Sequence, residues 1–107
     1  MGWRETTLTI PLNGTDSPVL DLAENGARRA FVMTIIGPAA LTGTVKIYVA
    51  KRTTDTFVIL QSGGTDITLP AVKATPLGVT TFGAMKLVSS GAEAAARVFD
   101  IVGVAVK

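Results

Sequence analysis

The chain has 107 residues, of which 48% are hydrophobic and only 17% are charged, and its net charge is +2. This length favours one domain, and the apolar content excludes an intrinsically disordered chain. The sequence contains no cysteine and no histidine. Their absence excludes a disulfide framework, the usual zinc sites and a nucleophile activated by histidine. We therefore expect a single domain over residues 1–107, with no metal and no cofactor.

The N-terminal part alternates apolar and polar residues, as a strand with one buried face does. Leu8, Ile10 and Leu12 form the apolar side of residues 6–12, and Pro11 marks a strand end or a sheet edge. The next expected elements are a loop at 13–18, a short strand at 19–22 and a turn at 23–27.

The middle of the chain contains the clearest strands. Residues 29–36 are apolar on both faces, which indicates a central strand. Residues 44–51 alternate regularly. The inward side chains are predicted to be Val45, Ile47 and Val49, and the outward ones Lys46, Tyr48 and Ala50. Residues 57–60 and 66–69 flank a glycine-rich turn, which predicts a β-hairpin.

The C-terminal part ends in the most informative segment of the chain. Before it we expect a stretch at 70–76 that is interrupted by prolines, then strands at 79–83 and 84–88. A long hairpin loop with one helical turn is expected at 89–97. The last strand, residues 98–106, is apolar on both faces except at Asp100. Such a strand needs cover on both sides, from its own domain or from a neighbour. We expect it to be paired on both edges, with Asp100 paired or in solvent.

About eight short strands at intervals of 8–12 residues, with almost no helical periodicity, are typical of one fold class. The sequence predicts an all-β domain, an antiparallel β-sandwich or jelly roll.

The acidic residues offer no clear catalytic arrangement. Those in or beside expected loops are Asp16, Asp21, Glu24, Asp55, Asp66, Glu93 and Asp100. A glycosidase needs two carboxylates that face each other across a cleft, but turn capping and solvation explain such residues more simply. The glycine-rich segment 61–65 lacks the lysine and the following helix of a phosphate loop. We expect no catalytic residues and no enzymatic activity.

The five candidate interface residues are Trp3, Arg28, Arg29, Tyr48 and Asp100. Asp100 interrupts an apolar strand, so it needs solvent or a cation, and Arg97, Arg28 and Arg29 are the candidate partners. The aromatic candidates are Trp3, which is either a core lid or an interface anchor, and Tyr48 on an outward face.

Nucleic acid and membrane are not expected partners. Basic residues are scattered and the chain has one tryptophan, one tyrosine and four phenylalanines, whereas nucleic-acid binding needs a basic patch with stacking aromatics. No apolar run approaches the roughly 20 residues of a membrane-spanning helix.

Four segments resemble a known family in the succession and composition of their predicted strands. The segments are LTGTVKIYVA (41–50), DTFVILQSGG (55–64), MKLVSS (85–90) and VFDIVG (98–103). They resemble small virion proteins of tailed bacteriophages, in particular capsid decoration (cement) proteins with sandwich or jelly-roll folds. The resemblance implies a non-enzymatic protein that binds between subunits of the major capsid protein and stabilises the head.

The same resemblance implies a homo-oligomer, a dimer or trimer, on the capsid exterior after synthesis in the host cytoplasm. It supplies no site residues, because the family has no residue motif to match. The alternative is a phage tail or fibre module, or a β-sandwich module that binds cell-surface glycans.

Overall fold

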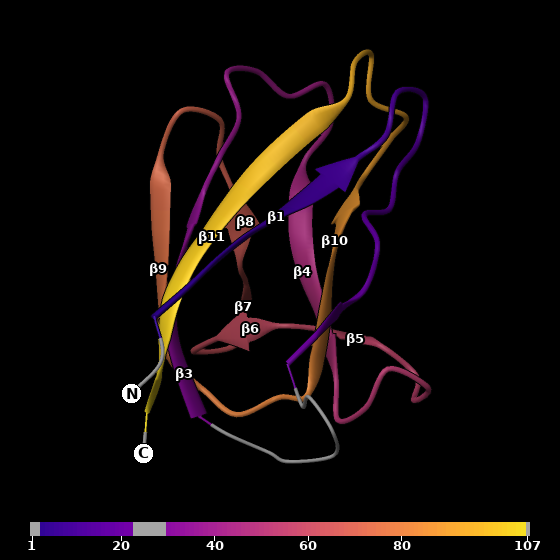
Figure 1. Ribbon diagram of the computed structural model, residues 1–107. Coiled ribbons are helices and arrows are strands. Elements are labelled where there is room, and N and C mark those ends of the chain that lie inside the picture. The colour runs from indigo at the N-terminus through magenta and orange to yellow at the C-terminus, as the bar shows by residue number, and fades with distance from the viewer. Residues whose placement is uncertain (1–2, 23–29, 107) are drawn as a thin grey trace.

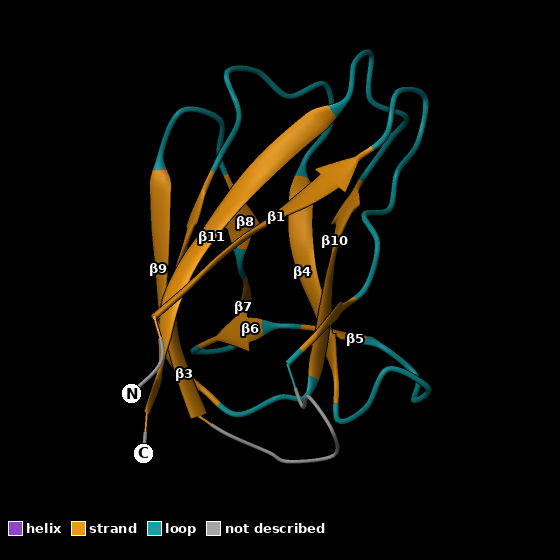
Figure 2. Cartoon of the chain, viewed as in Figure 1, coloured by secondary structure: helices purple, strands orange, loops and turns teal. Residues whose placement is uncertain are grey.

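The computed structural model describes residues 3–22 and 30–106, which consist of strands and loops only (Figure 2). The predicted all-β class is confirmed. The turn expected at 23–27 lies outside the described residues. The eleven strands of the described part are β1 (Trp3–Ile10), β2 (Leu20–Asp21), β3 (Ala30–Ile36), β4 (Val45–Ala50), β5 (Val58–Ile59), β6 (Gln61–Ser62), β7 (Thr65–Asp66), β8 (Thr68–Leu69), β9 (Ala74–Thr80), β10 (Ala84–Ser89) and β11 (Arg97–Val106).

Two antiparallel sheets form the layers of a sandwich (Figure 1). The four-stranded sheet has the order β1-β11-β3-β9. The five-stranded sheet has the order β2-β10-β4-β5, and β8 also pairs with β4. The short strands β6 and β7 pair with each other. In the described part of the chain, six pairs of consecutive strands are divided between the two main sheets: β1 and β2, β2 and β3, β3 and β4, β8 and β9, β9 and β10, and β10 and β11.

The core lies between the two sheets because each long strand turns one face inward. On β11 the inward residues Phe99 and Ile101 are 0% and 4% exposed, whereas Val98 between the strand start and Phe99 is 45% exposed. The buried cluster consists of Leu8, Ile10, Leu22, Phe31, Met33, Ile35, Val45, Ile47, Leu69, Met85, Leu87, Phe99 and Ile101. Successive side chains of a strand point to opposite faces, so every second residue of the long strands enters the core.

The strand β11 lies between β1 and β3 and is hydrogen-bonded to both (Figure 1). Asp100 is opposite Thr7 on one side and Ile36 on the other, and its side chain is exposed. Both parts of the prediction for residues 98–106 are confirmed: the strand is paired on both edges and Asp100 is in solvent. The strand β3 is also central, between β11 and β9, as predicted.

The predicted hairpin is present in a shorter form. Gly63 and Gly64 have φ angles of 61° and 83°, which glycine adopts without steric cost and which suit a two-residue hairpin turn. Only β6 and β7 pair across this turn, while β5 and β8 both pair with β4.

Several local predictions are wrong. Leu12 lies beyond the end of β1 and is 58% exposed, because Pro11 ends the strand. The Gly14 N–H donates to the Pro11 carbonyl and closes a turn there. Ala50 was expected outward but is 6% exposed, since the segment before β10 bonds to its carbonyl through Gly83 N–H. Residues 89–97 form no hairpin loop and no helical turn, because β10 and β11 belong to different sheets.

Candidate functional site

The outward side of the four-stranded sheet is the surface that stands out, and we call it the outer sheet face. It is the side opposite the core, so its members alternate along each strand with buried residues. Its described members are Glu5, Thr7, Thr9, Val32, Thr34, Ile36, Ala74, Pro76, Val79, Val98, Asp100, Val102 and Val104.

Apolar side chains dominate this face. Val32 and Ile36 on β3 are 38% and 39% exposed, Val98 on β11 is 45% exposed and Val79 on β9 is 65% exposed. The register makes three valines contiguous, because Val32 lies opposite both Val79 and Val104. Further along the face, Ile36 lies opposite Ala74 and Asp100. The strand predicted to need cover on both sides, residues 98–106, is thus covered by described residues on its inner side only. Contiguous exposed apolar surface of this kind marks interaction sites.

Two carboxylates stand at one flank of the outer sheet face. Glu5 is opposite Val102 and Asp100 is opposite Thr7, so the two acidic residues are diagonal neighbours on adjacent strands. Together with Thr7, Ile36 and Val102, and the backbone between them, they line an open hollow of about 480 Å³. Neither carboxylate has an ion-pair partner in residues 3–22 and 30–106. The flank is therefore acidic and unneutralised.

The carboxylates of the outer sheet face rise from one surface, whereas hydrolysis of a glycosidic bond needs two that face each other across a cleft. No three acidic side chains of the described residues gather closely enough to hold a metal ion. The geometry of this face therefore suits contact with another surface better than chemistry.

The other predicted interface residues lie apart from this face or outside the described part. Tyr48 is half-buried on the outward side of β4, in the other sheet, opposite Lys86. Lys86 Nζ lies 5.3 Å from the centre of the Phe57 ring and 3.1 Å from a carboxylate oxygen of Asp16. The backbone of Trp3 is paired with Val104, but its side chain is not described. Arg28 and Arg29 lie outside the described residues.

Sequence reasoning missed the role of Glu93, which we expected to be a solvated loop carboxylate. Its side chain is fully buried. One carboxylate oxygen accepts hydrogen bonds from Thr42 N–H at 2.8 Å and from Arg97 Nε at 2.9 Å. The other accepts them from Gly43 N–H at 2.9 Å and from Ser89 Oγ at 2.7 Å. Arg97, a candidate partner for Asp100, is therefore bound to Glu93 instead.

Glu93 joins three connections at one end of the sandwich. Its side chain binds the β3–β4 connection, and its backbone pairs with Asn13 and Gly14 in the β1–β2 connection. Burial alone raises the pKa of Glu93, but the bonds from Thr42, Ser89, Gly43 and Arg97 outweigh it and lower the pKa to about 2. With all four donors on it, the carboxylate is a structural anchor and has no free lone pair for proton transfer.

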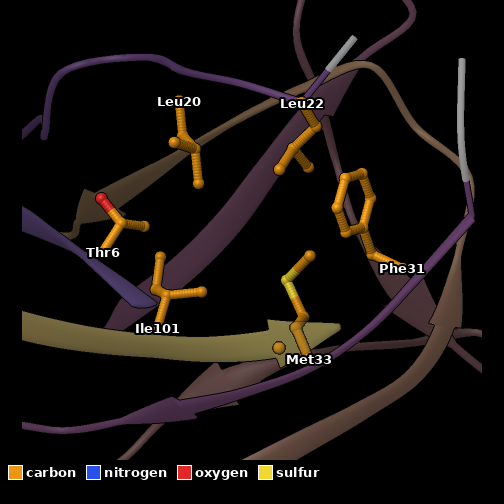
Figure 3. Close-up of a pocket in the computed structure, with 7 residues that line it drawn as sticks. Thr6, Leu20, Leu22, Phe31, Met33 and Ile101 are labelled. Atoms are coloured by element: carbon orange, nitrogen blue, oxygen red, sulfur yellow. The ribbon is translucent and has the colours of Figure 1, made fainter. Parts of the chain in front are cut away.

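The space between the sheets holds one small apolar cavity, shown in Figure 3. Its volume is about 10 Å³, and it is lined by Thr6, Leu20, Leu22, Phe31, Met33, Ile101 and Gly103. That volume matches about one water molecule, and an apolar cavity of this kind stays dry. The cavity therefore has no room for a ligand.

Comparisons with known proteins add a fold likeness only. No family model matches the sequence, and no curated protein matches it. The described part contains no helix that is long and apolar enough to cross a membrane. The structure is similar to the crystal structure of Yersinia pseudotuberculosis-derived mitogen (YPM), with a TM-score of 0.48 and 8% sequence identity. The similarity covers 95% of this chain and 84% of that chain, and we draw nothing about function from it.

Proposed function

We propose that this chain is a non-enzymatic structural protein that binds between subunits of the major capsid protein of a tailed bacteriophage and stabilises the head from outside. The observation that carries the proposal is the outer sheet face, a largely apolar surface centred on β3 and β11 that residues 3–22 and 30–106 leave exposed. The resemblance in strand rhythm to capsid decoration proteins supplies the partner.

A shell suits such a surface physically. Each square ångström of apolar area removed from water contributes about 25 cal/mol, so one copy of a flat face gives a modest contact. Repeated contacts on an ordered lattice, and more than one contact per oligomer, raise the overall affinity without stronger individual contacts. A small domain with an apolar face is therefore sufficient for a protein that acts in many copies.

The charges of the outer sheet face indicate what the partner surface carries. Both charged side chains described on this face, Glu5 and Asp100, are acidic. Two copies packed face to face would bring four carboxylates together without a cation, which is unfavourable. A partner surface that presents lysine or arginine among apolar residues would neutralise them. The face thus fits a different protein better than it fits itself.

Co-sedimentation tests the proposal. Empty heads assembled from the major capsid protein of a candidate phage are spun with the purified protein. We expect the wild type to pellet with the heads and a Val79→Lys, Val98→Lys double variant to stay in solution. Val58→Lys is the matched control, because Val58 is 59% exposed but belongs to the other sheet, and it should pellet normally. A wild type that stays in the supernatant, or a double variant that pellets equally well, contradicts the proposal.

A glycan-binding or tail module is the alternative, and one observation favours it. The five-stranded sheet presents Tyr48 beside Lys86 on a polar outward face, which is the kind of aromatic platform that a sugar ring covers. A glycan array tests it: a hit that Tyr48→Ala abolishes would support this function, and an array without hits would remove it.

A further inference from the structure

One edge of the strand β1 has no partner among the described residues. It forms the end of the four-stranded sheet, and all eight of its residues are in register with β11 on the other side. No described backbone group outside β11 bonds to residues 3–10. One edge of β1 therefore presents a row of N–H and C=O groups, which is a template for another strand.

The other edges of the two main sheets are protected. On β9, Pro76 has no N–H to donate, Gly78 has a φ of 68°, and the register shifts between Met33 and Thr34 of its neighbour. Proline and irregularity of this kind prevent edge pairing. The edge strands β2 and β5 of the other sheet have two residues each. Among the described edges, only β1 is long, regular and free of proline and glycine.

We propose that β1 pairs antiparallel with β1 of a second copy of this chain, about a two-fold axis perpendicular to the sheet. Such a contact uses the same residues twice, so the edge must be complementary to itself. The axis must pass through a residue, because only then do outward side chains lie opposite outward ones. An axis at Glu5 would set two carboxylates opposite each other, which is unfavourable.

An axis at Thr6 would leave the two Glu5 carboxylates as diagonal neighbours across the contact, whereas an axis at Thr7 separates them. With Thr7 on the axis, Glu5 lies opposite Thr9 of the second copy. In this register Arg4 is opposite an uncharged residue, Ile10. The threonine on the axis faces its own copy, and threonine pairs across strands are favourable. The edge of β1 is therefore complementary to itself near its centre.

Edge pairing would join the two four-stranded sheets into one of eight strands. A two-fold axis perpendicular to the sheet keeps both outer sheet faces on the same side. A dimer would then dock on a shell at two places at once, which raises its overall affinity above that of a single face. The dimer itself rests on the edge of β1 alone and not on the proposed shell role.

Light scattering after size exclusion, over micromolar to millimolar concentrations, tests the dimer. Thr7→Lys places a lysine on the free edge, and Asp100 opposite Thr7 gives it a counter-charge within the same copy, so the monomer stays folded. We expect the wild type to dimerise and Thr7→Lys to raise the dimer dissociation constant at least about tenfold. Thr65→Lys, an exposed threonine of the small hairpin, is the matched control and should dimerise like the wild type.

Cross-linking provides an independent measurement, because the natural chain has no cysteine. We expect Thr7→Cys to form a covalent dimer with a short bismaleimide reagent, and Thr65→Cys to remain monomeric. A wild type that stays monomeric at millimolar concentration, or equal cross-linking of both variants, overturns the proposed contact. A dimer that fails to bind heads would instead contradict the shell role and leave the β1 contact standing.

Discussion

Replacing Glu93 with glutamine is the sharpest test of how the sandwich is held together. Glutamine has nearly the same shape, but one of its two terminal groups is an amide that donates. Whichever way it turns, two of the four donors on Glu93 lose their acceptor: Thr42 N–H and Arg97 Nε, or Gly43 N–H and Ser89 Oγ. Arg97, whose side chain is only 15% exposed, also loses its counter-charge.

The expected loss at neutral pH is large. Removing one member of a buried ion pair costs about 3–5 kcal/mol because the other charge is left uncompensated. The pKa leads to a similar figure: a value lowered from 4.5 to about 2 corresponds to about 3 kcal/mol of stability, at about 1.4 kcal/mol for each tenfold change in proton affinity. A domain of this size has about 5–15 kcal/mol in total, so the Glu93→Gln variant should fold but unfold at much lower denaturant concentration.

The pH dependence identifies the cause. Because the folded pKa of Glu93 lies below its unfolded value, the unfolded chain takes up the proton first as the pH falls. The contribution of Glu93 is fully present above pH 4.5 and is lost as the pH falls from 4.5 towards 2. The difference in free energy of unfolding between the wild type and Glu93→Gln should therefore shrink by about 3 kcal/mol over that interval.

Urea unfolding followed by far-ultraviolet circular dichroism, at several pH values between 7 and 2, measures this difference. Ser89→Ala provides a milder variant, because it removes one bond to the carboxylate and should cost about 1.5–3 kcal/mol while it raises the pKa of Glu93. Asp55→Asn is the control, since its pair with Arg52 is exposed and 4.0 Å long and contributes less than about 1 kcal/mol. A difference between wild type and Glu93→Gln that does not change with pH would refute this account of Glu93.

Three further predictions concern stability. A Cβ at Gly43 would overlap Ser89 Oγ and lie 3.1 Å from Gly91 N, so Gly43→Ala should lower the free energy of unfolding by about 1–3 kcal/mol. Gly91→Ala is the control: its Cβ would meet no atom within 4 Å, so it should change the free energy of unfolding by less than about 0.5 kcal/mol. A Cβ at Gly103 would lie 2.7 Å from Val32 O across the β11–β3 ladder, so Gly103→Ala should cost a similar 1–3 kcal/mol or so in the same urea assay. Val79→Thr and Val98→Thr, on the outer sheet face, should each leave the unfolding midpoint almost unchanged, within about 0.5 kcal/mol, and a larger loss would show that these valines stabilise the monomer.

The sequence predicts the long strands well because their signal is local. Alternation of apolar and polar residues determines which side of a strand is buried, and it predicts Leu8, Ile10 and Ile47 on the side that enters the core. The two-sided apolar character of residues 29–36 and 98–106 correctly indicated central strands. The expected number of strands is too small because β6 lies within the segment 61–65 predicted to be a turn, and because β7 and β8 divide the region predicted to be one strand at 66–69. Strands of two residues carry too few residues to show a period.

The anchor at Glu93 was not predictable in the same way, because most of its partners are far away in the chain. Thr42 and Gly43 are 51 and 50 residues from it, and their contribution comes from backbone N–H groups, which every residue except proline has. The surrounding run of alanines carries no strand period and favours helix instead. One local signal was present: Ser89, Glu93 and Arg97 are spaced by four residues, and two of these pairs do bond.

The residues of the outer sheet face indicate whether its apolar side chains are needed for strand formation. β-Branched side chains favour strands whether they are polar or apolar, and threonine provides that preference as valine does. Thr7 and Thr9 on β1 and Thr34 on the central strand β3 occupy positions on this same face, among the valines and isoleucine. Strand formation therefore does not require Val32, Ile36, Val79 and Val98 to be apolar. What their methyl groups add is a surface that gains free energy when another protein covers it, and this is why we place the contact with a partner on this face rather than on the charged face of the other sheet.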